Sequence, residues 1–371
     1  MTDTAAATAQ AGPMTARHPR RVPPNFFAIP FGIAGLGEAW AAARPVLGLP
    51  PAVPDVFLAA AALLWLLLVV AYLAQGRPRI LADLRDPVLS PFTSLVVITP
   101  MIPGAALAEA NLTAGRVVVI VFAAATIALG GFLTGQWVVG DLDQGVAHPG
   151  YFLPTVAGGL VASYAAAEVQ LHSLAEGLFG IGVLCWLLLG SLILNRLFFT
   201  RMLPPPLVPT LAIELAPPAA AGVAWFAMNG GTIDLPARVL GGYAVLMALV
   251  QLRFLPVYRR LHFSPGFWAF TFSYTAAAGD ALCWIRFTAL PGGTALSIAA
   301  LVLVTGLVGA IAIRTARLAL RGQLLPAAPP APAAPTAPAS AAPAAASPAG
   351  AASPAARPRH RPRRTVTRQT D

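Results

Sequence analysis

Apolar runs about twenty residues long recur from Pro24 to Leu320, and they constrain the fold more than any other feature of the sequence. A helix of that length spans the roughly 30 Å hydrocarbon core of a bilayer. Charged residues and Pro/Gly clusters separate the runs. The ten runs lie near residues 24–44, 55–75, 89–108, 115–139, 151–171, 176–200, 207–228, 235–257, 264–286 and 293–320.

The composition is typical of a protein embedded in a lipid bilayer. Of the 371 residues, 57% are hydrophobic and only 10% are charged, whereas a soluble domain carries roughly a quarter charged residues. So few charges cannot cover a soluble surface, which excludes a cytosolic enzyme, a nucleic-acid-binding domain and a disulfide scaffold. The sequence also shows no P-loop, nucleophile elbow or metal-ligand spacing. We therefore expect an integral membrane protein with no catalytic residue, no cofactor and no metal site.

The arginines indicate the orientation. All 24 basic residues are Arg, and six of them lie in the last fifteen positions. If the N-terminus is inside, the cytoplasmic loops receive 14 of the remaining arginines and the opposite loops receive four. Positive charge favours the cytoplasmic side. The sequence thus predicts a multi-pass membrane protein with both termini in the cytoplasm.

Two tails flank the predicted membrane domain at residues 24–321. Residues 1–23 are expected to form a cytoplasmic N-terminal tail. Pro and Ala make up 28 of the residues in 326–371, and the arginine cluster follows. Such a segment has little to bury and is expected to be disordered in the cytoplasm. Its arginines could lie at the anionic inner leaflet, or the tail could simply be solubilising.

Proline and acidic residues alternate between successive runs. The odd-numbered runs hold Pro30, Pro91, Pro100, Pro154, Pro217, Pro218 and Pro265, as well as the acids Glu38, Glu168, Glu214 and Asp280. The interiors of the even-numbered runs lack proline. A kinked or charged helix is tolerated in a membrane where protein or water surrounds it. We therefore expect the odd helices to line a central path and the even helices to face lipid, as an all-α protein built from helical hairpins.

Five stretches in order resemble one known family. They are Pro24–Trp40 (PNFFAIPFGIAGLGEAW), Asp86–Phe92 (DPVLSPF), His148–Ala157 (HPGYFLPTVA), Leu215–Pro218 with Met228–Asp234, and Leu252–Pro256 with Phe267–Phe272. These motifs resemble the tellurite-resistance/dicarboxylate transporter family, which includes bacterial TehA, fungal malate permease and sulfite efflux pump, and the plant guard-cell slow anion channels (SLAC-like proteins).

The resemblance implies a fold and a function. The fold would be ten transmembrane helices in five hairpins around a pseudo-five-fold pore, assembled as a homotrimer. The function would be passage of small inorganic or organic anions through the bilayer, with the odd helices kinked at Pro30, Pro100, Pro154 and Pro217 lining the pore. In that family a phenylalanine of the ninth helix plugs the pore, and the match places it at Phe272.

Alternatives remain open from the sequence. The chain could be a proton-coupled carrier for C4-dicarboxylate, sulfite or tellurite, or a membrane scaffold or receptor with a vestigial pore. Each of the four acids in the odd-numbered runs could pair with an Arg or hydrogen-bond a neighbouring helix. These acids are Glu38, Glu168, Glu214 and Asp280. Alternatively, one of them could be a protonatable coupling site, and Glu214 is then favoured because it lies beside the Pro217 kink.

Two smaller expectations concern local structure. His148 is expected to cap the fifth helix rather than to bind a ligand. We also expect a helix-packing seam, in which small residues let two helices approach closely. It would be formed by Gly131 and Gly135, with Thr134 and Gln136.

The orientation is testable with fusions. A reporter that is active only in the periplasm should be silent when fused after Arg321 and active when fused within residues 229–235. The reverse pattern would contradict the orientation, and equal activity at both sites would contradict the count of ten spans.

Overall fold

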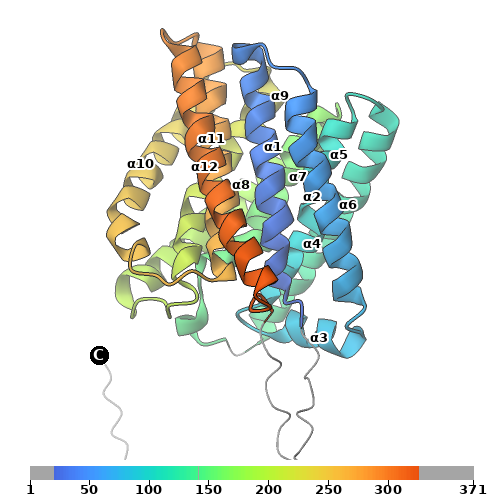
Figure 1. Ribbon diagram of the computed structural model, residues 1–371, viewed down its shortest axis with the longest axis vertical. Coiled ribbons are helices and arrows are strands. Elements are labelled where there is room, and N and C mark those ends of the chain that lie inside the picture. Colours follow the sequence, from blue (N-terminus) through green and yellow to red (C-terminus); the bar gives the residue numbers. More distant parts are fainter. Residues whose placement is uncertain (1–20, 141, 326–371) are drawn as a thin grey trace, which may run out of the picture. The chain divides into compact units, whose positions relative to one another are not determined.

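The computed structural model describes residues 21–140 and 142–325, and within these ranges the chain is helical and contains no strand (Figure 1). The expectations for the C-terminal tail at 326–371, and for all but the last three residues of the N-terminal tail, lie outside the described residues. Each predicted apolar run coincides with a long helical segment. The end of the bundle that holds Arg21 and Leu325 is called proximal, and the other end is called distal.

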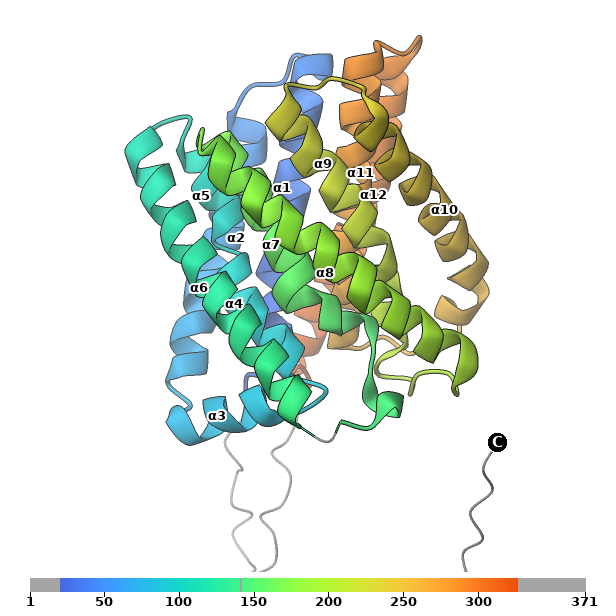
Figure 2. The same cartoon turned by 180° about the vertical axis from the view of Figure 1, so that it is seen from behind.

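The even-numbered segments are single uninterrupted helices that run from the distal to the proximal end. They are α2 (Ala52–Leu73), α6 (Leu112–Val139), α8 (His172–Phe199), α10 (Leu235–Tyr258) and α12 (Gly293–Leu320). A short additional helix, α3 (Arg77–Arg85), lies across the bundle axis at the proximal end (Figure 2). Gln136 ties α6 to this helix, because its side-chain amide donates a hydrogen bond to the Leu84 carbonyl at 2.6 Å.

The odd-numbered segments run the other way, and each starts with a 3-10 helix. The first is η1 (Pro24–Phe27) followed by α1 (Ala28–Leu47), and the third is η2 (Ser90–Ser94), α4 (Leu95–Ile98) and α5 (Met101–Leu107). The fifth is η4 (Pro149–Phe152), the π-helix η5 (Leu153–Ala157) and α7 (Gly158–Glu168). The seventh is η6 (Val208–Leu215) and α9 (Ala216–Asn229), and the ninth is η7 (Pro265–Phe267) and α11 (Trp268–Thr288).

A proline occupies the first or second position of all five opening 3-10 helices: Pro24, Pro91, Pro149, Pro209 and Pro265. Proline is tolerated at the start of a helix because the N–H that it lacks would have no partner in the helix. The repeating proline therefore marks where each inner segment begins. The set that the sequence suggested overlaps it only at Pro91 and Pro265.

Burial separates the two kinds of segment. In the segments Pro24–Leu47, Ser90–Leu107 and Val208–Asn229, 72–83% of the most apolar window is buried inside the protein, compared with 17–28% for the five even helices. The even helices instead expose large apolar side chains, such as Leu63, Leu66, Leu184 and Leu188. An exposed apolar surface of this extent fits contact with lipid. The odd segments thus lie inside the described bundle and the even helices surround them.

Eight of the described helical segments are long and apolar enough to cross a membrane. The fifth and ninth segments, Pro149–Glu168 and Pro265–Thr288, fall outside those criteria. The chain is therefore an all-helical, multi-pass membrane protein. The full count of ten crossings and their five-fold arrangement stay predictions.

Small residues bring the first and ninth segments into close contact. A Cβ atom at Gly32 would overlap Thr271, and one at Gly35 would lie 2.9 Å from Cδ2 of Phe272. Glycine therefore lets the α1 backbone approach α11, as small residues commonly do between membrane helices. This contact fixes the position of Phe272 relative to α1.

The packing seam lies elsewhere than the sequence suggested. Nothing lies within 4 Å of a Cβ built at Gly131 or Gly135, so the expectation that these glycines pack against another helix of the described chain was wrong. The close backbone approach is instead between α7 and α8. A Cβ at Gly159 would lie 2.7 Å from the Gly182 nitrogen and 3.0 Å from the Leu178 carbonyl oxygen.

The close contact at Gly159 and the open space at Gly131 give a matched pair of substitutions. Gly159→Ala should lower the free energy of unfolding by about 1–3 kcal/mol, because its methyl group meets backbone that cannot rotate away. Gly131→Ala should leave it unchanged or raise it by up to about 1 kcal/mol, because alanine favours the helix and the space is open. Thermal melting of both variants in detergent checks this. Equal destabilisation by both would show that Gly131 is also packed.

Candidate functional site

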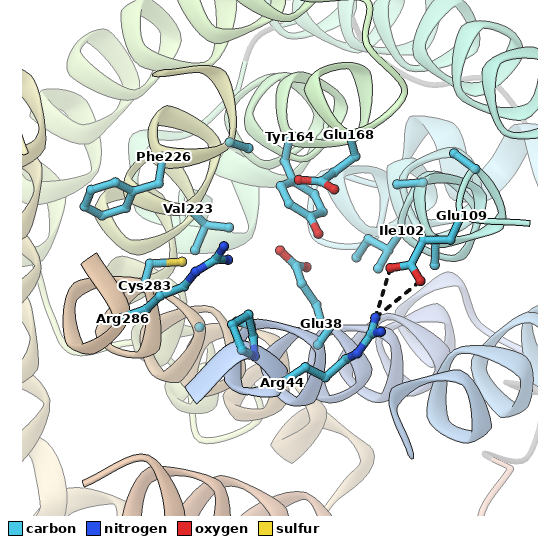
Figure 3. A pocket seen from close by; sticks show the side chains of 18 of the residues that line it. Glu38, Arg44, Ile102, Glu109, Tyr164, Glu168, Val223, Phe226, Cys283 and Arg286 are labelled. Atoms are coloured by element: carbon cyan, nitrogen blue, oxygen red, sulfur yellow. Dashed lines mark hydrogen bonds and ion pairs between the residues drawn. The ribbon is translucent and has the colours of Figure 1, made fainter. Parts of the chain in front are cut away.

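A wide cavity opens at the distal half of the bundle. It has a volume of about 870 Å³, and all five odd segments contribute to its wall, through residues that include Glu38, Ile102, Tyr164, Val223 and Cys283. Figure 3 shows the carboxylates of Glu38 and Glu168 and the phenol of Tyr164 turned toward the space between them. A polar space of this size has room for many water molecules.

The space then narrows to a neck. The neck has a volume of about 10 Å³, and Glu38, Tyr164 and Val223 line both it and the wide cavity. Leu160, Ala220, Phe272 and Ala276 complete most of its wall. A volume of about 10–15 Å³ is the lower limit for a single water molecule, so a hydrated ion does not fit.

A third space lies on the proximal side of Phe272. It holds about 40 Å³, and it shares Leu160, Ala220 and Phe272 with the neck. All five odd segments again contribute to the wall, which is formed mainly by apolar side chains such as Phe92, Val156 and Trp268. Because successive spaces share lining residues, the three follow one another between the inner segments.

Phe272 separates the neck from the proximal space. Its side chain is 8% exposed, and its ring stacks on Phe31 of α1 with 3.8 Å between ring centroids and 16° between ring planes. Trp268, one turn earlier on α11, is also buried, and its indole N–H donates to the Thr315 hydroxyl at 2.9 Å. Phe272 therefore lies between the two narrow spaces, stacked on Phe31, which lines the proximal one.

The four prolines expected to line a pore have different surroundings. Pro217 is the second residue of α9 and lines the proximal space. Pro154 lies in the π-helix η5 and lines a separate lateral cavity of about 290 Å³ against α6 and α8. Pro100 breaks the third segment between α4 and α5, and Pro30 lies in the first turn of α1. Neither of these last two lines any of the four cavities described here.

The charged side chains of the wide cavity are only partly paired. Arg44 donates to Glu109 at 3.0 Å. The Arg286 guanidinium lies 4.8 Å from the centre of the Phe287 ring. Within residues 21–140 and 142–325, Glu38 and Glu168 have neither an ion pair nor a hydrogen bond, so the alternative that these two acids pair with an arginine or hydrogen-bond a neighbouring helix does not hold for them.

Glu214 and Asp280 are placed differently. Both are buried, with 6% and 5% exposure, and each has a carboxylate oxygen that finds no hydrogen-bond partner in the described chain. Asp280 faces α9, where a Cβ at Gly222 would overlap its carboxylate. Neither residue lines the wide cavity, the neck or the proximal space. The structure therefore separates Glu214, the favoured coupling site from the sequence, from these spaces.

His148 acts as a helix cap. Its Nδ1 accepts a hydrogen bond from the Gly150 N–H at 3.1 Å, and its Nε2 lies 3.3 Å from the Val88 carbonyl oxygen. Burial lowers the pKa of His148 to about 4, so the ring is neutral near pH 7 and can accept at Nδ1 while it donates at Nε2. The expectation that His148 caps the fifth segment is confirmed.

Sequence reasoning missed three features of the site. Phe31, the stacking partner of Phe272, follows Pro30 in the opening motif but shows no sign of its role there. Tyr164 lies one helical turn before Glu168, and that i, i+4 spacing could have placed it on the same face. The Arg44–Glu109 pair joins residues that are far apart in sequence, so no local pattern indicates it.

The buried acids give one prediction. Glu214→Gln and Asp280→Asn should keep or raise the melting temperature, because a neutral group of the same shape replaces a carboxylate that lacks a partner. Transport by either variant in liposomes, with and without a pH gradient, should match the parent. Loss of pH-dependent transport in Glu214→Gln alone would restore Glu214 as the coupling site.

Comparison with known proteins identifies relatives. The sequence matches the family described as "Voltage-dependent anion channel" (SLAC1) over residues 21–316. It is 27% identical over 314 residues to the Tellurite resistance protein TehA homolog of Haemophilus influenzae, an alignment that covers 84% of this chain and 94% of that protein.

Plant relatives match over shorter stretches. The Guard cell S-type anion channel SLAC1 of Arabidopsis thaliana is 27% identical over 146 residues, which is 39% of this chain and 26% of that channel. The S-type anion channel SLAH1 of the same plant is 27% identical over 200 residues, which is 53% of this chain and 51% of that channel. The chain belongs to the SLAC1 family of voltage-dependent anion channels, as the motifs in the first, third, fifth, seventh and ninth segments suggested.

Proposed function

We propose that this protein is an anion channel whose path runs from the wide distal cavity through the neck to the proximal space. The observation that carries the proposal is that all five inner segments surround this series of spaces, and that the series closes at the stacked rings of Phe272 and Phe31. The names of the relatives add support, because the plant proteins are called anion channels.

The chemistry of the walls favours small, partly dehydrated anions. Arg44 and Arg286 line the wide cavity together with Glu38, Glu109 and Glu168, and Arg286, which forms no ion pair among the described residues, offers an entering anion a contact there. Beyond them the neck and the proximal space are narrow, and apolar side chains form most of their walls. An ion must therefore lose most of its water to pass, so bore diameter and backbone dipoles would select the ion.

The remaining parts of the proposal concern the assembly. The protein would cross the bacterial inner membrane ten times, as five hairpins around the path, with both termini in the cytoplasm. It would form a homotrimer with one path in each protomer. The alternation of buried odd segments and exposed even helices supports the hairpin arrangement.

Phe272 is proposed as the gate, and replacing it gives the sharpest test. Phe272→Ala removes the ring between the neck and the proximal space, so anion conductance in planar bilayers should rise severalfold. Its melting temperature should fall less than that of a core variant, because the ring borders open space on two sides. Phe272→Leu should open the path less, since more of the volume remains.

Phe270 on the same helix provides the matched control. It is 6% exposed, and its ring packs on that of Tyr258 with 4.8 Å between the ring centroids. It lines none of the three spaces. Phe270→Ala should lower the free energy of unfolding by about 3–5 kcal/mol and give no new current. If Phe272→Ala behaves like Phe270→Ala, Phe272 is a packing residue and the gate lies elsewhere. Saturable flux that stops without a pH gradient would instead favour the coupled carrier.

A further inference from the structure

Glu38 lies at the point where the path narrows. It is the one acidic residue, within residues 21–140 and 142–325, that lines both the wide cavity and the neck next to Phe272. Figure 3 shows its carboxylate turned into the cavity toward Tyr164. Any ion that travels from the wide cavity to Phe272 must therefore pass this carboxylate at close range.

The groups around Glu38 do not neutralise it through a direct bond. Tyr164 and Glu168 face the cavity from α7, Glu109 faces it from the turn between α5 and α6, and Cys283 and Arg286 face it from α11. Arg44 lies on the same helix and is held by Glu109 at 3.0 Å. In the described chain neither arginine pairs with Glu38.

The other elements around α1 add no charge at the neck. α9 contributes Val223, Phe226 and Ala227, which cannot ionise. Asp55 of α2 is exposed and does not line the cavity. α12 packs on α1 and has no ionisable residue between Gly293 and Ile313. Asp280 of α11 is buried against α9 and lines neither the wide cavity nor the neck, and the Tyr164 phenol in the neck wall is neutral near pH 7. Among the described residues, Glu38 therefore decides the charge of the neck.

We infer that Glu38 makes anion passage depend on pH, an inference that rests on the proposed path. An ionised carboxylate in a neck this narrow repels an anion that has shed its water, and little solvent is present to screen the repulsion. When the carboxyl is protonated, the repulsion disappears and its O–H can donate a hydrogen bond to the passing anion. Conductance then rises as the pH of the distal solution falls.

This role differs from proton coupling through Glu214. Glu38 needs only to gain or lose a proton from the wide cavity, which is open to solution, and the proton does not have to cross with the anion. The anion flux stays passive and its direction follows the electrochemical gradient of the anion alone. A pH gradient would change the size of the current and leave its reversal potential in place.

The experiment uses the full-length protein in planar bilayers, with chloride and nitrate as probe anions. Phe272→Ala should conduct on the order of tenfold more at pH 5 than at pH 8 on the distal side. Adding Glu38→Gln should remove this dependence and hold the current at the high level, and Glu38→Ala should do the same. Two substitutions guard against a folding defect in one, and melting temperature in detergent checks both.

Glu168→Gln in the same background is the matched control, because Glu168 lines the wide cavity but not the neck. It should keep the pH dependence. A pH-independent current in Phe272→Ala, or a dependence that survives Glu38→Gln, would overturn the role of Glu38 and leave the path standing. Absence of current in Phe272→Ala at every pH would overturn the path and this role with it.

Discussion

The absence of water in a bilayer governs this structure, because every backbone N–H and C=O in the hydrocarbon must find a partner within the protein. Regular α-helices meet that demand at the lipid surface, and the five even helices are unbroken. The irregular backbone is confined to the inner segments, with their 3-10 openings, the α4–α5 break and the π-helix η5. The outer helices screen it from lipid, so the interior can depart from α geometry.

Glycine and aromatic residues then shape that interior. Gly32 and Gly35 bring α1 onto α11 so closely that the rings of Phe31 and Phe272 stack. The same approach leaves Glu38, one turn farther along α1, in the wall of the widening space. The closure at Phe272 and the acid beside it thus follow from a single interhelical contact.

The sequence was sufficient for much of the fold. Apolar runs located the helical segments, because their length is imposed by the bilayer, and the odd–even alternation was recovered because buried acids and interior prolines are unfavourable beside lipid. The orientation of individual side chains could not be predicted. The inner helices are apolar or small on all sides, so the sequence favoured Glu214 only for its place beside Pro217, and only packing showed that Glu38 faces the wide cavity and Glu214 does not. Sequence reasoning missed the repeating prolines Pro24, Pro149 and Pro209, because a proline at the start of a helix looks the same in sequence as a proline in an ordinary loop between helices.

The division between the two kinds of segment has a consequence for biogenesis. The fifth and ninth segments, Pro149–Glu168 and Pro265–Thr288, are not among the eight described segments that are long and apolar enough to cross a membrane. Each is followed after a short turn by a long apolar helix, α8 or α12. If these two segments cross the bilayer as proposed, the unit that partitions from the translocon into lipid would be the hairpin, in which the second helix carries the first across. An inner segment synthesised without its successor would then remain at the interface, and the order of helices along the chain would also be an order of assembly.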